Sequence, residues 1–260
     1  MIEANVFNQL LIWPILNFLM AFYKVFELIK LPGAFGLAII AMTIFIRLLL
    51  YPLMGSQLKS AKKMQDLKPR LDELAKKYGK DKGRLQQEQL KLYKEAGVNP
   101  AAGCLPLLLQ MPVFIALYNV FWQILGNGNL EKVVQEINQI VYFPFLRIQG
   151  IDLSFFGANL GIKPSSWQTD GIWLLAIPLI TALLQWYQTK LMTPPSAKAS
   201  EGKSSPDKDD AAKIMQGQMS FLFPLMIGWF AFSFPVGLSL YWNTFSVLGI
   251  IQQLQINKGK

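Results

Sequence analysis

Histidine is absent from the 260-residue chain, and Cys104 is its one cysteine. These shortages exclude a disulfide framework, a histidine- or cysteine-rich metal site, and any catalytic device of the Ser–His–Asp or Cys–His kind. The GxxxxGK(S/T) motif that binds nucleotide phosphates is also missing, so no ATPase is visible. We therefore expect a protein that is not an enzyme, with no catalytic residue, no cofactor and no metal.

Charged residues are scarce as well. They make up 16% of the chain, whereas hydrophobic residues make up 52% and the mean hydropathy is +0.31. A soluble domain carries about 25% charged residues, so this chain has too few to cover a water-facing surface. The composition predicts an all-α membrane protein with a formal net charge of +9.

Five apolar blocks approach the length of about 20 residues that a helix needs to cross a bilayer. They predict a five-transmembrane-helix bundle with spans at residues 34–53, 101–125, 171–192, 215–234 and 236–255. The last two blocks are separated by Phe234-Pro235-Val236-Gly237, where proline and glycine indicate a tight hairpin.

The N-terminal block, residues 1–33, is apolar but is interrupted by polar and charged residues such as Asn8 and Lys24. This pattern is typical of an amphipathic helix that lies in the membrane interface, and we place it on the outer side. Pro32-Gly33 would end it. A sixth membrane span is the alternative.

The distribution of basic residues sets the orientation. Residues 54–100 hold twelve Lys and Arg against six acidic residues, whereas residues 126–170 hold three against four. The positive-inside rule then places 54–100 in the cytoplasm and 126–170 outside, where we assign no role to the segment. The flexible loop 193–214 and the short tail 256–260 fall in the cytoplasm.

The cytoplasmic segment predicts a basic helical hairpin. Apolar residues recur every three or four positions over Ser56–Tyr78 and again over Arg84–Ala96, with a glycine-bounded turn between them. We expect Pro69 to kink the first arm. The hairpin is either a solvated spacer or a docking device for an acidic partner or for lipid headgroups.

Arg47 is the one formal charge well inside a span, at a cost of roughly 2.5–3.5 kcal/mol on insertion scales. None of the five spans contains an aspartate or glutamate. The side chain could snorkel to the cytoplasmic interface, although helical side chains lean toward the helix N-terminus, which here points outward. We favour a wetted cavity between helices, in which Arg47 keeps its charge.

Other polar residues inside the spans could line that cavity: Thr43, Gln110, Gln185, Gln188, Tyr241, Trp242 and Asn243. Each has a plainer interpretation, since threonine can bond its own backbone, glutamine can join helices, and aromatic residues often mark the interface. Together with Arg47 they favour a shared polar groove that attracts anionic groups.

Four motifs in order resemble the YidC-type membrane protein insertases, the family that includes the Oxa and Albino insertases. They are Ile46-Arg47-Leu48-Leu49-Leu50-Tyr51-Pro52-Leu53, Tyr93–Pro100, Gly103–Pro106 with Leu109–Phe114, and Phe234–Trp242. The resemblance implies five core helices around a hydrophilic groove that opens to cytosol and lipid. It also implies that Arg47, Thr43, Gln188, Tyr241 and Trp242 line this substrate groove.

The resemblance further implies a function and partners. The protein would insert nascent membrane proteins and act as their chaperone, alone or beside the Sec translocon, in a bacterial plasma (inner) membrane. Ribosome, signal recognition particle with its receptor, and membrane lipids are possible partners, and no sequence-specific nucleic-acid binding is expected. A transporter or channel for small anions that uses Arg47 is the alternative.

Overall fold

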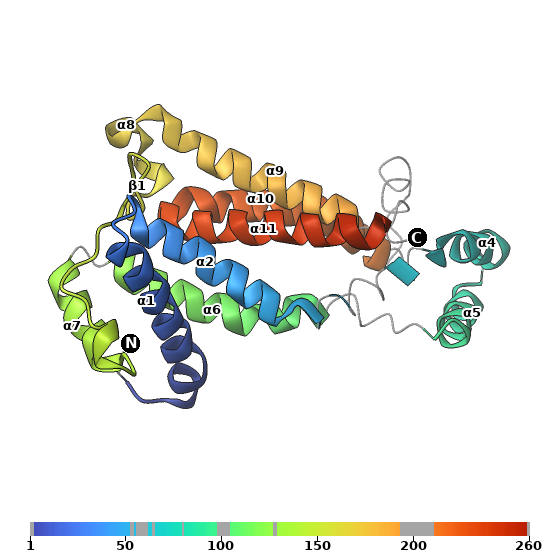
Figure 1. Ribbon diagram of the computed structural model, residues 1–260. Helices are drawn as coiled ribbons and strands as arrows, with labels where there is room; N and C mark the ends of the chain where they lie inside the picture. Colours follow the sequence, from blue (N-terminus) through green and yellow to red (C-terminus); the bar gives the residue numbers. More distant parts are fainter. Residues whose placement is uncertain are drawn as a thin grey trace.

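The computed structural model describes residues 3–52, 55, 62–63, 66–79, 81–97, 105–126, 129–192 and 211–258, which are mostly helical (Figure 1). Several predictions fall outside these residues. They are most of the loop 193–214, the start of the first hairpin arm, the Gly103-Cys104 motif and the side chain of Gln110.

Five helices form an elongated bundle in Figure 1: α2 (Ala34–Leu49), α6 (Leu105–Gly126), α9 (Ala176–Met192), α10 (Ala211–Ser233) and α11 (Val236–Lys258). α11 contacts each of the other four and packs most extensively on α2 and α9. α10 and α11 are separated by Phe234 and Pro235 alone, which places the break where the sequence predicts a hairpin. α11 is therefore the helix that connects the other four in the bundle.

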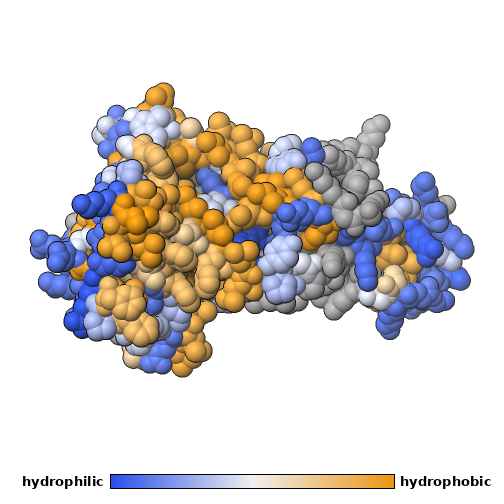
Figure 2. All heavy atoms as spheres, viewed as in Figure 1, coloured by the Kyte–Doolittle hydropathy of each residue, from blue (hydrophilic) through white to orange (hydrophobic). Residues whose placement is uncertain are grey.

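Only some of the apolar helices have the length that a membrane span needs. Among the described residues, Asn8–Leu28 and Ile172–Leu191 are long and apolar enough to cross a bilayer, and Ala34–Leu49, Met111–Gly126 and Phe221–Ser233 are shorter apolar helices. Figure 2 shows hydrophobic residues over much of the bundle and hydrophilic residues over the hairpin. The count of five spans stays a prediction.

The N-terminal block forms η1 (Asn8–Ile12), a π-helical turn, and α1 (Trp13–Leu28), which packs on α2. α1 contributes fully buried side chains to the core, among them Leu16, Leu19 and Met20. Gly33 ends the connection with φ of +74°, a conformation that glycine adopts at low cost, and its Cα faces the ring of Phe155. The interfacial position of this block stays a prediction.

The segment that the sequence places outside contains α7 (Leu130–Ile140), η3 (Pro144–Leu146), η4 (Pro164–Ser166) and α8 (Trp167–Asp170), and η5 (Ile172–Leu175) follows it. We call it the outer segment, and the end of the bundle beside it the outer end. It also contains a two-stranded antiparallel hairpin, β1 (Ser154–Phe155) and β2 (Ala158–Asn159), in which Ser154 pairs with Asn159. α7 is amphipathic, because its apolar residues recur at helical spacing on one buried face: Val133, Val134, Ile137 and Ile140.

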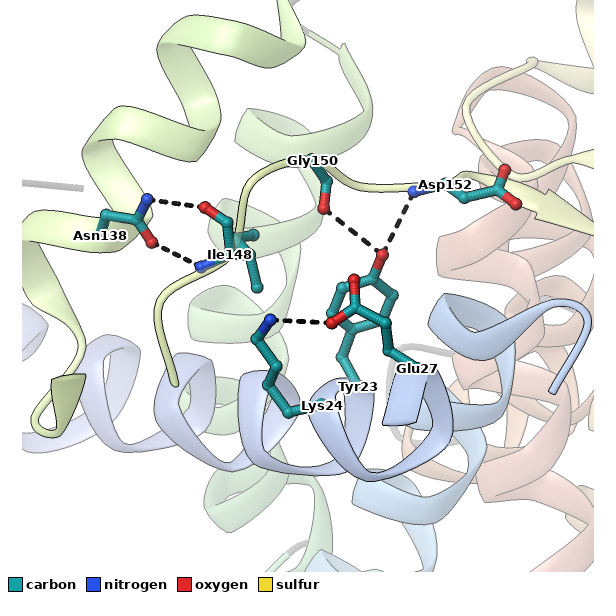
Figure 3. Close-up of polar contacts among 7 residues, drawn as sticks. All are labelled: Tyr23, Lys24, Glu27, Asn138, Ile148, Gly150 and Asp152. Atoms are coloured by element: carbon teal, nitrogen blue, oxygen red, sulfur yellow. Dashed lines mark hydrogen bonds and ion pairs between the residues drawn. The ribbon is translucent and has the colours of Figure 1, made fainter. Parts of the chain in front are cut away.

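Polar contacts hold the outer segment in place (Figure 3). The Asn138 amide donates to the carbonyl of Ile148 at 2.8 Å and accepts from its N–H at 2.9 Å. The hydroxyl of Tyr23 on α1 lies 3.4 Å from both the carbonyl of Gly150 and the N–H of Asp152.

The far end of the outer segment joins the bundle through main-chain bonds. The N–H groups of Val236 and Gly237 at the start of α11 donate to the carbonyls of Ile162 and Leu160, each at 2.9 Å. Residues 129–166, whose role the sequence left open, therefore tie α1 to the outer end of α11.

The hairpin that the sequence places in the cytoplasm consists of α4 (Lys68–Tyr78) and α5 (Lys82–Glu95), which contact one another at the far end of the molecule from α7 (Figure 1). Asp81 begins the second arm, because its carboxylate accepts from the N–H of Arg84 at 3.1 Å and caps α5. Pro69 stands in the first turn of α4, where the missing N–H of proline costs nothing. Most of the first arm before Asp66 lies outside the described residues, so the kink at Pro69 stays a prediction.

Candidate functional site

Arg47, in the last turn of α2, reaches across to α11. Its Nη2 donates to the main-chain carbonyl of Phe245 at 3.1 Å, and its guanidinium carbon lies 4.0 Å from the centroid of the Phe245 ring. The residue is 7% exposed. The guanidinium is therefore held between helices by a carbonyl dipole and an aromatic face, although Arg47 belongs to the last turn of α2.

Gln188 of α9 meets Arg47 above Gly249 of α11. A methyl group built on Gly249 would overlap Nη2 of Arg47 and would lie 2.6 Å from Nε2 of Gln188. The ends of both side chains thus occupy the space that any larger residue at 249 would fill. Side chains from α2 and α9 come together here on the surface of α11.

Trp242 forms a second polar contact, closer to the outer end of α11. Its indole Nε1 donates to Oε1 of Gln185 on α9 at 2.9 Å, and the Gln185 amide lies 3.4 Å from the hydroxyl of Thr189. The Trp242 ring also packs edge-on against Phe114 of α6, with centroids 5.1 Å apart. Trp242 thereby links α11 to both α9 and α6.

The other predicted site residues lie deeper. The hydroxyl of Thr43 donates to the carbonyl of Ile39 on its own helix at 2.6 Å and is fully buried, which is the plainer of its two interpretations. Tyr241 is 1% exposed and packs between the rings of Phe121 and Phe245. The structure therefore brings Arg47, Gln188 and Tyr241 together around residues 245–249, and the lining role of Thr43 and Tyr241 stays a prediction.

Sequence reasoning missed Phe245 and Gly249. One is a phenylalanine among eighteen and the other has no side chain, so neither carries a chemical signal of its own. They can be recognised only from the structure, where they lie one helical turn apart on α11 beside the buried Arg47.

Further polar groups run along one face of α11. Ser239, Asn243 and Ser246 follow at spacings of four and three residues, so they share a helix face. Their side-chain oxygens are buried and have no hydrogen-bond partner among the described residues. Buried polar atoms nearly always find a partner in a folded protein, so this stripe marks a face that suits water or a polar guest.

A cleft lies toward the outer half of the bundle, beside Ser239. It has a volume of about 20 Å³ and is lined by Thr181, by the apolar side chains of α10, and by Phe114 and Trp242 from α6 and α11. α6 and α10 make little contact with one another, and Tyr118 packs on Phe234 at the outer end, with ring centroids 5.2 Å apart. Exposed apolar side chains continue along α10: Phe221, Leu222, Leu225, Met226 and Trp229.

The polar groove and its hydration stay predictions, since Arg47 is packed against protein on most of its surface. Figure 2 shows hydrophilic residues between the hydrophobic patches in the middle of the bundle. The described residues hold no group of three or more His, Cys, Asp or Glu side chains that could bind a metal ion. The site around Arg47 therefore combines a fixed positive charge with neutral hydrogen-bonding groups.

Comparison with known proteins connects this geometry to a family. Residues 25–260 match the family described as 60Kd inner membrane protein. The membrane protein insertase YidC of Oceanobacillus iheyensis is 34% identical over 258 residues, which cover 98% of this chain and 84% of the relative. The inner membrane ALBINO3-like protein 1 of the Chlamydomonas reinhardtii chloroplast is 34% identical over 88% of this chain.

A crystal structure of an active YidC insertase with its first transmembrane domain resolved is similar over 99% of this chain, with a TM-score of 0.55 and 29% identity. The chain spans 47% of that protein and 45% of the algal relative. The likeness therefore covers nearly the whole of this chain but about half of these longer proteins.

Proposed function

We propose that this chain, which belongs to the YidC-type membrane protein insertase family, moves hydrophilic segments of nascent membrane proteins part-way across the bilayer. The observation that carries the proposal is the buried guanidinium of Arg47, held where α2, α9 and α11 meet. The work needs no nucleotide hydrolysis, and the protein acts alone or beside the Sec translocon. We place the protein in a bacterial plasma membrane, as a multi-pass bundle with its C-terminus in the cytoplasm.

The electrostatic part of the mechanism follows from the surroundings of Arg47. Its guanidinium is a fixed positive charge that is 7% exposed and lies among a carbonyl, an aromatic ring and an amide. A fixed charge in a medium of low dielectric constant attracts an anionic group much more strongly than it does in water. An acidic client segment therefore lowers its cost of entering the bilayer by approaching Arg47.

The stripe of Ser239, Asn243 and Ser246 supports the same path. A hydrophilic client segment brings carbonyls, hydroxyls and amides that must keep hydrogen-bond partners away from bulk water. The buried oxygens on this face of α11 offer such partners. They extend the polar surface from the level of Arg47 toward the outer half of the bundle.

The apolar part of the client needs a separate route to lipid. α6 and α10 make little mutual contact, and the cleft between them is lined by aromatic and aliphatic side chains such as Phe114 and Phe230. A client helix can leave between these two helices while its polar neighbour stays at α11. Because Arg47 is 7% exposed, the helices around it separate when the polar segment enters.

Photo-crosslinking tests the path. A photoreactive residue at position 242 should crosslink to a nascent membrane protein on ribosomes, because Trp242 faces α6 and α9 in the interior. The matched control is position 247 on the same helix, where Val247 is 41% exposed on the bundle surface. Equal client crosslinks from both positions would argue against an interior path.

Replacement of Arg47 tests the charge. Arg47→Ala should slow the insertion of a client with an acidic translocated tail roughly tenfold or more, since a charge-assisted hydrogen bond contributes about 1.5–3 kcal/mol. Arg47→Lys should retain more activity, and a neutral-tailed version of the same client should be affected less. Chloride flux through proteoliposomes without client crosslinks would favour the anion transporter instead.

Deletion of residues 59–95 tests the hairpin. The hairpin joins the bundle through few described contacts, one of them the bond from Nζ of Lys62 to the carbonyl of Ile256 at 3.1 Å. We expect its removal to impair insertion while the bundle keeps its thermal unfolding midpoint. Full insertion activity would reduce the hairpin to a spacer.

A further inference from the structure

Gly249 lies in the interior of α11, where glycine is a poor choice for helix stability because its backbone has more freedom to lose than alanine's. Its surroundings explain the choice. The ends of Arg47 and Gln188, from two other helices, occupy the volume in which a Cβ at 249 would stand. We infer that Gly249 is a positioning residue, which sets where the guanidinium and the amide lie, and this inference rests on the proposed function.

Helix geometry shows why the missing side chain falls at this place. In an α-helix the N–H of residue 249 bonds to the carbonyl of residue 245, and a side chain leans back over the turn that precedes it. A side chain at 249 would therefore cover the carbonyl of Phe245. With glycine there, the Phe245 carbonyl can accept a second hydrogen bond, which Nη2 of Arg47 donates at 3.1 Å.

Substitution of Gly249 by alanine should therefore move Arg47 without unfolding the bundle. Both atoms that the methyl group would meet are at the ends of flexible side chains, which can move at low cost. A clash with backbone atoms could not be relieved in this way. The Gln188 amide has to retreat by roughly 1 Å to reach ordinary van der Waals separation, and the guanidinium has to leave its place on Phe245. Alanine also has the better helix propensity, so we expect the thermal unfolding midpoint to stay or rise.

The test uses the full-length protein in lipid nanodiscs with isotope-labelled arginine. The chain has four arginines, and Arg47→Lys identifies the Arg47 signals by their loss. In the wild type the Phe245 ring should shield the Arg47 side chain, since the ring centroid is 4.0 Å away. In Gly249→Ala these signals should move toward those of exposed arginines. Gly126→Ala is the matched control, since its new methyl group meets Trp122 at an ordinary 3.5 Å.

Insertion is measured on the same variants with the acidic-tailed client. Gly249→Ala should reduce insertion toward the level of Arg47→Ala, and it should cause no further loss when Arg47 is already alanine. Unchanged Arg47 signals in Gly249→Ala would overturn the inference, and so would additive losses in the double variant. If the signals move but Arg47→Ala inserts clients at the wild-type rate, the positioning role stands and the proposed role of the charge fails.

Discussion

Trp242→Phe should destabilise the bundle through one defined hydrogen bond. The indole Nε1 of Trp242 donates to Oε1 of Gln185 at 2.9 Å, and phenylalanine keeps an aromatic ring but has no donor. Gln185 is 7% exposed, so its carbonyl oxygen cannot readily turn to bulk water. The variant therefore leaves a buried acceptor without this donor between α9 and α11.

The magnitude follows from the cost of an unsatisfied buried polar group, which is about 1–3 kcal/mol. Trp242→Phe should lower the free energy of unfolding by that amount, plus a smaller loss of packing on Phe114. Gln185→Met removes the acceptor and keeps an unbranched side chain of similar length. The double variant should then be more stable than the sum of the single changes predicts, with a coupling of about 1–2 kcal/mol.

The assay is equilibrium unfolding of the reconstituted protein in mixed micelles. Unfolding is monitored by far-ultraviolet circular dichroism, which reports helix content without relying on tryptophan fluorescence. Trp229→Phe is the control, because Trp229 is 65% exposed on α10 and has no comparable buried partner to lose. The reasoning fails if Trp242→Phe unfolds like this control, or if its effect adds fully to that of Gln185→Met.

Three further predictions concern the outer segment and the hairpin. Asn138→Ala should cost about 1–3 kcal/mol and raise hydrogen exchange in residues 130–150, because both main-chain groups of buried Ile148 lose their partner. Tyr23→Phe should cost less than Asn138→Ala in the same assay, because its two bonds are long, at 3.4 Å. Burial raises the pKa of Tyr93 above its ordinary value of 10.0. The folded hairpin thus favours the protonated form, and its helicity should be stable below pH 10 and fall as pH rises further, with Tyr93→Phe less sensitive.

The elements that could be predicted from the sequence are those that local chemistry determines. Proline and glycine mark the break between α10 and α11, and helical periodicity marks the two arms of the hairpin. The expected kink at Pro69 stays a prediction, because most of the first arm before it lies outside the described residues. Proline suits the first turn of a helix better than its middle, and α4 begins there.

Residues of the site could be predicted from the sequence only where their chemistry is unusual for the segment around them. Arg47 stands out as a charge in an apolar run, and it does lie buried between helices. Its neighbours do not stand out, since the bond to Phe245 joins residues 198 positions apart and the opening at Gly249 is the absence of a side chain. Such partners follow from the crossing of α2, α9 and α11, which no single segment of the sequence encodes.

The bundle exposes many large apolar side chains and encloses a few polar ones in a mostly apolar core. Its buried side chains include Arg47, Gln185, Ser246 and Gln252, whereas large apolar residues such as Trp229 are exposed. Among the described residues, four of the nine buried polar or charged ones lie on α11: Ser239, Ser246, Gln252 and Gln253. A helix enclosed by its neighbours does not need an apolar surface all round, because protein and not lipid surrounds it. The polar residues buried on α11 are therefore an argument for the proposed path, in which a polar client segment meets this helix.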